Sequence, residues 1–452
     1  MRRTILAVTA AGLLLFGCTS GDSSSSDTTS GGDSTASTTA ETFPTGPAPG
    51  VTDTSVKVGV AYVDLASLAG IVDIDHGDYE AAYNALFDKI NADGGINGRT
   101  IEPVYAPIAP TGNEPADAAC TKLTEDDDVF LIMGFFLGDN VLCPVATHST
   151  AVIGGVLTGE RLAQADAPWY SNEGSEDLQA EAVRSMAEAG DLDGTVGVFG
   201  GPEEQALMDD VILPLLDELG VDVAESAIVD QSADDTAGTD NATQVIGQRF
   251  EAAGVDQVIV LGTSSIAWAR GVAATDYRPA LRFTESGAIN TYVGQESADL
   301  TVLEGAELGG LFGGSANQYD LPAMQDCLGI IEDAGIEVPD PEGQETADEQ
   351  PWTSSMTACQ QVVLFQALVE AAGEDLNYGS LQGGAEGLVV DMPNQPTPLT
   401  FGNGESGDGD PPAYLFDFDA DARAFVLREG QVDDTSDGGD GGSSDTTDTT
   451  AG

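Results

Sequence analysis

Apolar residues recur along most of the chain in two alternating rhythms that predict strands and helices in turn. Between 78 and 91 they stand three and four positions apart, the period of a helix with one buried face. Short β-branched and aromatic runs on either side predict strands at 55–62 and 100–106. Further strands are predicted at 129–133, 151–154, 195–199, 222–228, 257–261 and 281–284, and further helices at 114–124, 140–147, 177–189, 203–219, 241–253 and 265–275. This alternation favours parallel sheets with helices on both faces, and its restart after residue 170 predicts two consecutive α/β cores.

A glycine-rich stretch, 91–99, separates the first predicted helix from the strand that follows it. Gly94 and Gly95 stand where a helix needs a left-handed C-cap, and Asn97-Gly98 supplies a second tight turn. The stretch is therefore predicted to be a helix-to-strand connector with no chemistry of its own.

The first 18 residues have the composition of an export signal. A basic pair, Arg2-Arg3, precedes an apolar run that ends in Leu15-Phe16-Gly17-Cys18. This looks like a bacterial lipoprotein signal with its lipobox, in which residues 1–17 are removed and Cys18 becomes lipidated. An ordinary secretory signal with a chance cysteine is the alternative, and both predict export. No later run reaches the roughly 18 apolar residues of a membrane-spanning helix, so Cys18 is expected to be the only anchor.

Both ends of the chain are poor in large apolar residues. Residues 18–50 consist almost entirely of Ser, Thr, Gly, Asp, Ala and Pro after the cysteine, and 431–452 has a similar composition. Such segments bury too little apolar surface to offset the entropy of ordering. We expect a flexible tether at 18–50 and a disordered acidic tail at 431–452.

The charge balance limits the partners that this chain can have. Its 77 acidic residues stand against 14 basic ones, a formal net charge of −63. Such a surface repels nucleic acid and anionic membranes, so neither is an expected partner. With only three lysines, the composition suits a medium of high salt, where screening weakens the repulsion among like charges.

Four cysteines follow the signal: Cys120, Cys143, Cys327 and Cys359. Export to an oxidising compartment favours pairing, and of three possible connectivities the simplest joins sequence neighbours. No pair has the CxxC spacing of a metal or redox site, and His76 and His148, the only histidines, lie in no catalytic motif. The acidic run 125–128 lacks the ligand spacing of a calcium loop. No metal or cofactor is therefore expected.

Several motifs occur in an order typical of one family. After the lipobox and the tether come 91–99, Leu131-Ile132-Met133-Gly134, Leu261-Gly262-Thr263, Phe283-Thr284-Glu285-Ser286-Gly287, a predicted helix at 358–373 and Pro398-Leu399-Thr400-Phe401. In this order the chain resembles the type I solute-binding proteins of ABC transporters over residues 51–428. Among them the branched-chain amino-acid-binding branch is the most similar.

The resemblance implies a two-lobed type I periplasmic-binding-protein fold, α/β, each lobe a mainly parallel sheet with helices on both faces. Three hinge crossings are expected, near Trp169, Gly313 and Gln395. The first lobe would then comprise 51–170 and 314–395, and the second 171–313 and 396–430. Hinge closure requires a ligand that touches both lobes.

The resemblance also implies a set of ligand-binding residues. In the first lobe they are Gly138, Asp139, Asn140, Thr158 and Tyr170, and in the second Glu204, Gln205, Thr263, Ser264 and Glu285. Glu285 matches the carboxylate that receives a ligand's ammonium group, although it is also one of many surface acids. Asp139 would repel an anion, and a helix N-cap is its alternative role. The family's serine-rich version of 138–140 is absent.

The expected function is that of an extracytoplasmic solute receptor of an ABC importer. It would be lipid-anchored at Cys18, monomeric, without cofactor, and would bind a small polar or amino-acid-like molecule for an ABC permease. A ligand-sensing surface lipoprotein that signals to a partner receptor is the alternative. Glu204 and Glu285 could in principle form a glycosidase pair. No local pattern supports that spacing, and GxSxG, P-loop and HExxH motifs are absent, so no enzyme is expected.

Overall fold

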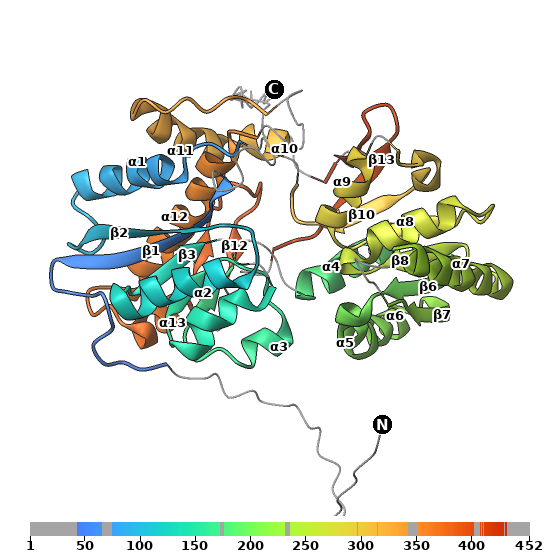
Figure 1. Ribbon diagram of the computed structural model, residues 1–452, viewed down its shortest axis with the longest axis horizontal. Helices are drawn as coiled ribbons and strands as arrows, with labels where there is room; N and C mark the ends of the chain where they lie inside the picture. Colours follow the sequence, from blue (N-terminus) through green and yellow to red (C-terminus); the bar gives the residue numbers. More distant parts are fainter. Residues whose placement is uncertain are drawn as a thin grey trace, which may run out of the picture. The chain divides into compact units, whose positions relative to one another are not determined.

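The computed structural model describes residues 43–65, 75–134, 136, 138–171, 176–230, 236–295, 297–313, 315–341, 350–401, 407, 409, 411–428 and 430–431 (Figure 1). The predicted signal peptide, Cys18, most of the predicted tether and nearly all of the predicted acidic tail lie outside these residues. Within the described ranges, no helix has both the length and the apolar composition needed to cross a membrane.

The first sheet has five parallel strands in the order β2-β1-β3-β4-β5 within the described residues. The strands are β1 (Ser55–Val63), β2 (Thr100–Ile108), β3 (Leu131–Gly134), β4 (Ala151–Ile153) and β5 (Trp169–Tyr170). Val56, Val58 and Val60 on one face of β1 have no exposed surface, and Gly59 and Ala61 on the other face are also buried, as expected for a central strand covered on both faces. The predicted parallel arrangement of this region is confirmed.

Helices from distant parts of the chain cover this sheet. They are α1 (Tyr79–Ala92), α2 (Asn113–Thr121), α3 (Gly159–Leu162), α10 (Ser315–Tyr319), α11 (Pro322–Asp333), α12 (Thr353–Ala372) and α13 (Tyr378–Ala385). In Figure 1, α1 and α11 lie above the strands and α2 below them. The long helix α12 packs against α1, α11 and α13 with Leu364, Phe365 and Leu368 fully buried. The C-terminal third of the chain therefore completes the first core.

The second sheet has seven strands in the order β14-β13-β10-β9-β8-β6-β7 within the described residues. The strands are β6 (Thr195–Gly200), β7 (Asp222–Ile228), β8 (Gln257–Val260), β9 (Ala280–Phe283), β10 (Glu307–Gly310), β13 (Tyr414–Asp419) and β14 (Ala424–Leu427). All pairings are parallel except those of β13 with β10 and with β14. A separate hairpin pairs β11 (Val389–Val390) with β12 (Leu399–Thr400).

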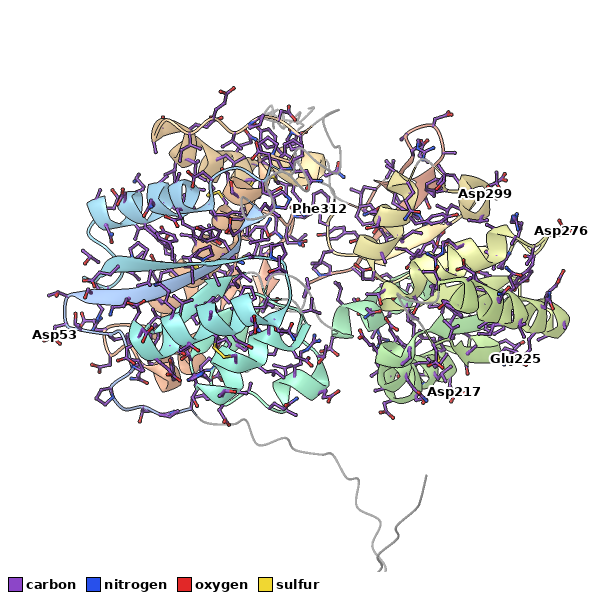
Figure 2. All side chains as sticks on the ribbon, in the orientation of Figure 1. Asp53, Asp217, Glu225, Asp276, Asp299 and Phe312 are labelled. Atoms are coloured by element: carbon purple, nitrogen blue, oxygen red, sulfur yellow. A yellow bond between two sulfur atoms is a disulfide. The ribbon has the colours of Figure 1, made fainter. Side chains whose placement is uncertain are left out.

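Two apolar cores lie against the second sheet, one centred on Trp268 and Phe250, the other on Ile212 and Leu216. Its helices are α4 (Glu176–Ala189), α5 (Gln205–Leu207), α6 (Leu213–Leu219), α7 (Thr236–Ala253), α8 (Ser265–Ala273) and α9 (Ser286–Gly294). Acidic side chains such as Asp217 and Asp276 are exposed at the periphery, as is Asp53 on the first sheet (Figure 2). The negative charge is thus carried by the solvated surface.

Two predicted helices differ from the structure, and prolines lie in both. The segment predicted as helix 140–147 is a 3₁₀ turn, Gly138–Val141, followed by a π-helical turn, Cys143–Thr147, that contains Pro144. The segment predicted as helix 203–219 is divided by a π-helical turn, Met208–Ile212, next to Pro214. Proline has no N–H for the regular helical ladder, so the hydrogen-bond pattern changes locally. A further π-helical turn, Lys122–Asp126, extends α2.

The connector at 91–99 has the predicted structure. Gly95 lies at φ +75°, and a Cβ there would stand 2.0 Å from the carbonyl oxygen of Arg99. Its N–H donates to the Ile90 carbonyl at 2.9 Å, which caps α1. Asn97 donates from Nδ2 to the carbonyl of Val369 on α12 at 2.9 Å. The connector therefore also fixes α12 beside α1.

Residues 43–50 belong to the folded body and not to the tether that composition predicts for 18–50. The N–H of Gly379 donates to the Pro44 carbonyl at 2.9 Å, and Lys57 N donates to Gly50 O at 2.8 Å. Phe43 packs against the first core. Its apolar ring adds to the burial of the first core, so this end of the predicted tether is part of the folded body.

The chain passes between the two sheets in three places. The first lies between β5 and α4, and the second between Phe312, in the second core, and Tyr319, which packs on the first. The third was expected near Gln395. However, Leu399 and Phe401 are buried in the first core, Gly407 pairs with Tyr170 of β5, and the Thr400 N–H donates to the Gly409 carbonyl. This passage therefore lies between Gly409 and Tyr414, which is buried in the second core. The boundary at 396 was set too early, because the β11–β12 hairpin belongs with the first sheet.

Candidate functional site

The predicted ligand residues of the first lobe follow the carboxyl ends of two strands. Gly138–Asn140 comes after β3, and Thr158 comes after β4. Parallel neighbouring strands end at a common edge of the sheet, so these segments share that edge, where ligands gather in open α/β folds. Gly154, at φ +118°, permits the close approach of the strands there, because a Cβ would stand 2.2 Å from Gly134 O.

An arginine that the sequence did not single out joins these segments. Arg161 Nε donates to Asp139 Oδ1 at 2.9 Å, and Arg161 Nη1 donates to the Val156 carbonyl at 3.4 Å. Thr158 holds the arginine's backbone in place, because its Oγ1 accepts from Arg161 N at 3.2 Å as the N-cap of α3. Asp139 is therefore the partner of a guanidinium and caps no helix.

The arginine also lies close to Gly138. A Cβ at that glycine would stand 3.8 Å from Arg161 Nη2, and the residue adopts φ +52°. One sequence signal was available: Arg161 is the only lysine or arginine between Lys122 and Arg184 in this strongly acidic chain. Gly138, Asp139, Thr158 and Arg161 thus form one group, which we call the Arg161 cluster.

Tyr170 does not join the Arg161 cluster through its hydroxyl. The side chain has no exposed surface, and its ring packs edge-on against Phe401 with 5.7 Å between centroids. Its hydroxyl has no hydrogen-bond partner in the described part of the chain. Burial raises the pKa of this phenol well above its ordinary value. Tyr170 is therefore part of the core beneath the carboxyl edge.

In the second sheet, Glu204 brings Thr263 and Ser264 together. Only 7% of Glu204 is exposed. Its Oε1 accepts from Thr263 N at 3.0 Å and Thr263 Oγ1 at 3.1 Å, and its Oε2 accepts from Gly201 N at 2.8 Å and Ser264 Oγ at 3.2 Å. Four donors thus satisfy a carboxylate that has no cationic partner among the described residues. We call this group the Glu204 clamp.

The Glu204 clamp fixes the turn that follows β8. Gly262 lies at φ +48°, and a Cβ there would stand 2.5 Å from Glu204 Oε1. The Gly262 N–H also donates to Gln179 Oε1 at 3.0 Å, and Thr284 Oγ1 donates to the same oxygen at 2.7 Å. Sequence reasoning missed both residues: Gln179 lies in no motif, and within the motif 283–287 only Glu285 was assigned to the site. Thr263 itself is exposed at this edge.

Glu285 and Gln205 lie outside the Glu204 clamp's hydrogen bonds. Glu285 is the N-cap of α9: one carboxylate oxygen accepts from Gly287 N and the other from Ala288 N, the latter at 3.0 Å. Gln205 is exposed, and its Nε2 lies 3.5 Å from Asp209 Oδ2 on the next turn. Glu285 thus already has a structural role, whether or not it also meets a ligand.

A partly buried ionic network joins β9, β10, β13 and the residue after β14 in the second sheet. Glu307, the first residue of β10, meets Arg282 Nε at 3.2 Å and Arg428 Nη2 at 2.5 Å, and Arg428 also pairs with Asp191 and Asp417. Burial raises the pKa of Glu307 to about 7 despite the two arginines. Glu307 begins β10, whereas Arg282 is the third residue of β9 and Arg428 follows β14. None of the residues of this network is among the predicted ligand residues.

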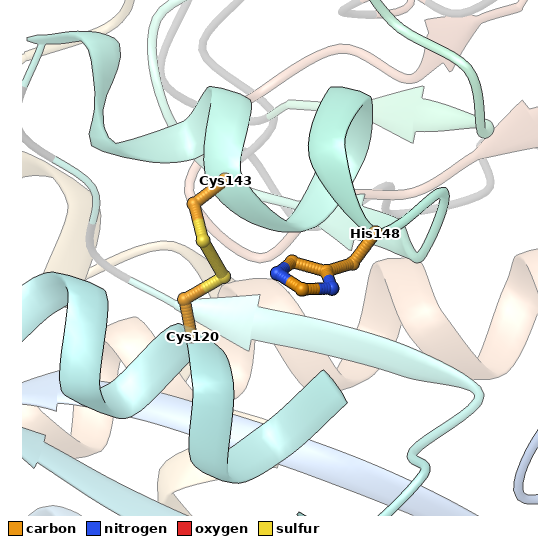
Figure 3. A group of neighbouring side chains, drawn as sticks. All are labelled: Cys120, Cys143 and His148. Carbon is orange, nitrogen blue, oxygen red and sulfur yellow. A yellow bond between two sulfur atoms is a disulfide. The ribbon is translucent and has the colours of Figure 1, made fainter. Parts of the chain in front are cut away.

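The cysteines pair as the simplest connectivity predicts, Cys120 with Cys143 and Cys327 with Cys359. His148 lies beside the first pair, with a ring nitrogen facing the sulfur atoms (Figure 3). Its Nδ1 is 3.8 Å from Glu125 Oε1. Both sulfur atoms are committed to the disulfide, so the group offers an imidazole and no thiolate to a metal ion.

The comparisons with known proteins agree with this architecture. Residues 55–423 match the profile of a family described as periplasmic binding protein. A substrate-binding protein of an ABC transporter from Desulfitobacterium hafniense, in complex with Leu, superposes with a TM-score of 0.56 at 13% identity, over 83% of this chain and all of that one. No curated protein matches the sequence.

Two further solved structures are similar at this level. A leucine-, isoleucine-, valine-, threonine- and alanine-binding protein from Brucella ovis, in a closed conformation, has a TM-score of 0.54 at 14% identity, covering 83% of this chain and 94% of that one. A solute-binding protein from Rhodopseudomonas palustris, in complex with p-hydroxybenzoic acid, has a TM-score of 0.54 at 13% identity, covering 83% and 95%. At such identities the likeness shows the fold alone.

The family match covers most of the chain, and both sheets have the topology that the resemblance implied. Proteins of this family bind solutes and are not enzymes, in agreement with the sequence prediction. The chain therefore belongs to the periplasmic binding protein family, in the two-lobed type I form with mainly parallel sheets.

Proposed function

We propose that this protein is the extracytoplasmic receptor of an ABC importer and that it binds a small carboxylate-bearing solute between its two lobes. The Arg161 cluster lies at the carboxyl edge of the first sheet, and the Glu204 clamp lies where β6 and β8 of the second sheet end. A solute that touched both groups would stabilise a closed state.

The observation that carries the proposal is the position of Arg161. Its side chain is 22% exposed, and no hydrogen bond from Nη2 is found within the described part of the chain. A guanidinium presents paired N–H donors that match a carboxylate. Asp139, which alone would repel an anion, is compensated by this arginine. The electrostatic objection to an anion at Gly138–Asn140 is therefore removed.

The relatives support the same ligand chemistry. The solutes named for them, leucine and p-hydroxybenzoic acid, each carry a carboxylate, as do the fatty acids of a similar transporter protein from Thermomonospora curvata. An amino acid would add an ammonium group, for which Glu285 remains the candidate partner. Replacing Glu285 by Gln would then weaken binding of leucine but not of a simple carboxylate.

The remaining parts of the proposal concern location and partners. We propose that Cys18 carries the lipid anchor, that the chain is a monomer, and that an ABC permease receives the solute. The net charge of −63 suits a receptor working in high salt, because screening lowers repulsion between the lobes during closure. The acidic surface also disfavours direct binding to anionic lipid.

A thermal-unfolding screen in high salt tests the proposal. The panel contains amino acids, short aliphatic carboxylates and aromatic carboxylates, each beside its uncharged amide. A ligand at 100 times its dissociation constant adds about 2.7 kcal/mol to the free energy of unfolding. The proposal predicts stabilisation by at least one carboxylate and loss of that effect in Arg161→Gln. A carboxylate that stabilises both proteins equally would remove Arg161 from the site.

A further inference from the structure

A histidine and a glutamate lie beside the Cys120–Cys143 disulfide, and neither is among the predicted ligand residues. The two sulfur atoms and an imidazole nitrogen of His148 all lie within 4.8 Å of one another, the only such group of His, Cys, Asp or Glu side chains within the described ranges. In Figure 3 the ring nitrogen farther from the His148 backbone, Nε2, faces the sulfur atoms. The other nitrogen, Nδ1, lies 3.8 Å from Glu125 Oε1. The imidazole therefore stands between the disulfide and a carboxylate.

Two π-helical turns bring these residues together. Cys143 begins one of them, and His148 follows its last residue and donates its N–H to the Cys143 carbonyl at 3.1 Å. A π-helical turn closes a hydrogen bond between residues five apart, which an α-helix would point in different directions. Glu125 lies in the other turn, Lys122–Asp126, which comes shortly after Cys120. Such turns are frequent at functional sites, and here two of them flank the same disulfide.

With the disulfide reduced, the group has the donor set of a zinc site. Two thiolates and one imidazole nitrogen are a Cys₂His set, which holds Zn²⁺ in a tetrahedron with a fourth position for water. Bond lengths of about 2.3 Å to sulfur and about 2.0 Å to nitrogen place such donor atoms roughly 3.5–3.8 Å apart. Donor atoms that already lie within 4.8 Å need only small side-chain rotations to reach this geometry. Glu125 has the place of the carboxylate that commonly orients a metal-bound histidine through its other nitrogen.

We propose that reduction of Cys120–Cys143 by a dithiol opens a binding site for a thiophilic divalent cation such as Zn²⁺, with His148 Nε2 as the third ligand. In the reduction step the dithiol gives its two thiol hydrogens to the cysteine sulfurs and becomes a disulfide itself. Binding of the cation then displaces both thiol protons to solvent, because only the thiolate coordinates. The disulfide form closes the site, and the reduced form opens it. This site is independent of solute binding, so either proposal can fail alone.

The two disulfides differ in their access to a reductant. Cys143 and His148 are partly exposed and Glu125 is exposed, so a dithiol can reach this pair from solvent. Cys327 is only 7% exposed and Cys359 is fully buried, both in the first core. The rate of thiol–disulfide exchange depends on access to the attacked sulfur. The first pair should therefore be reduced first, and the second pair serves as an internal control.

Titration of the full-length protein with Zn²⁺, before and after reduction, tests the proposal. Dithiothreitol reduces the protein and is removed without air, and calorimetry then measures Zn²⁺ binding while the charge-transfer absorption of bound Co²⁺ reports thiolate ligands. Alkylation with iodoacetamide, read by mass spectrometry, shows which cysteines the metal protects. Cys120→Ser/Cys143→Ser removes the thiolates, His148→Gln removes the imidazole, and His76→Gln changes the only other histidine as the matched control. Circular dichroism follows the fold of each protein.

The proposal predicts that the reduced protein binds Zn²⁺ in a one-to-one complex that protects Cys120 and Cys143 from alkylation, and that the oxidised protein does not bind it. Glu125→Gln should weaken binding by roughly tenfold to a hundredfold, the usual effect of losing a carboxylate behind a metal-bound histidine, and His148→Gln by more. His76→Gln should bind as wild type. Absence of binding by the reduced protein, equal affinity in His148→Gln, or binding that survives loss of both cysteines would each overturn the assignment. So would a reduced protein that unfolds and that Zn²⁺ does not refold.

Discussion

Arg161 and Asp139 form an ion pair, with 2.9 Å between Nε and Oδ1, in which the two side chains differ in exposure. The arginine side chain is 22% exposed and the aspartate side chain 79% exposed. The arginine is further held by the Val156 carbonyl, and the Thr158 cap holds its backbone. Asp139 can therefore turn away into solvent at low cost, whereas Arg161 stays at the edge of the sheet. An incoming carboxylate would meet a cation already in place.

Replacing Arg161 by Gln should weaken carboxylate binding by roughly one to two orders of magnitude, the usual effect of losing a charged hydrogen bond. Isothermal titration calorimetry measures this loss. Arg249→Gln is the matched control, because Arg249 pairs with a partly exposed acid, Glu225, on the far strand β7. Asp139→Asn should leave binding intact or strengthen it, since it removes the competing anion. Unchanged affinity in Arg161→Gln would contradict the account.

Replacing Glu204 by Ala should lower the free energy of unfolding by about 2 kcal/mol and weaken ligand binding. The change removes the acceptor of the buried Gly201 N–H, and an unsatisfied buried group costs about 1–3 kcal/mol. Denaturant unfolding and calorimetry provide the two readouts. The neighbouring Glu203 is exposed, so Glu203→Ala should change neither quantity. Equal effects of the two substitutions would show that the Glu204 clamp does not organise the turn.

Removing either disulfide by Cys→Ser double substitution should lower the free energy of unfolding by about 3 kcal/mol. The two bridges close loops of 23 and 32 residues, so the loop-closure entropy that they remove from the unfolded chain is similar. Denaturant titration measures the loss for each bridge. Equal stability of the wild type and either double variant would contradict the prediction.

Stability should fall as the pH rises from 4.5 to about 7 through the ionisation of Glu307. Its pKa in the folded protein is raised from 4.5 to about 7, so the folded state binds the proton more tightly than the unfolded chain. The contribution is present below pH 4.5 and lost as pH passes 7. Unfolding free energies between pH 4.5 and 8 measure it.

Glu307→Gln should flatten that pH profile, whatever it does to absolute stability. Glu304→Gln, at an exposed position shortly before β10, should leave the slope unchanged and so accounts for the general charge of the surface. If both variants keep the wild-type slope, the pH dependence belongs to other acids.

The sequence predicted those features of the fold that depend on local pattern. The alternation of strands and helices, the glycine connector at 91–99 and the pairing of neighbouring cysteines all followed from residues close together in the chain. The passage near Gln395 was misplaced because Leu399 and Phe401 pack on a sheet formed some 230 or more residues earlier. A local sequence pattern cannot predict a contact between residues so far apart in the chain.

The site was predicted less completely, for the same physical reason. Thr263 and Ser264 were expected at the ligand edge. The residue that accepts their hydrogen bonds, Glu204, lies 59 and 60 residues away in the sequence. Glu204 also accepts a hydrogen bond from the backbone N–H of Gly201, three residues before it. Arg161 was missed because its role depends on Asp139, 22 residues earlier, across two strand ends. The tertiary neighbours of a charged residue determine whether it caps a helix, forms an ion pair or remains available to bind a ligand.

The most direct test of the central claim is calorimetric titration of the full-length protein, in high salt, with matched carboxylates and carboxamides: hexanoate with hexanamide, benzoate with benzamide, and leucine beside both. The account predicts that at least one carboxylate binds, that its amide binds at least tenfold more weakly, and that Arg161→Gln removes this difference. Equal binding of a carboxylate and its amide, or binding of none of these carboxylates, would contradict it.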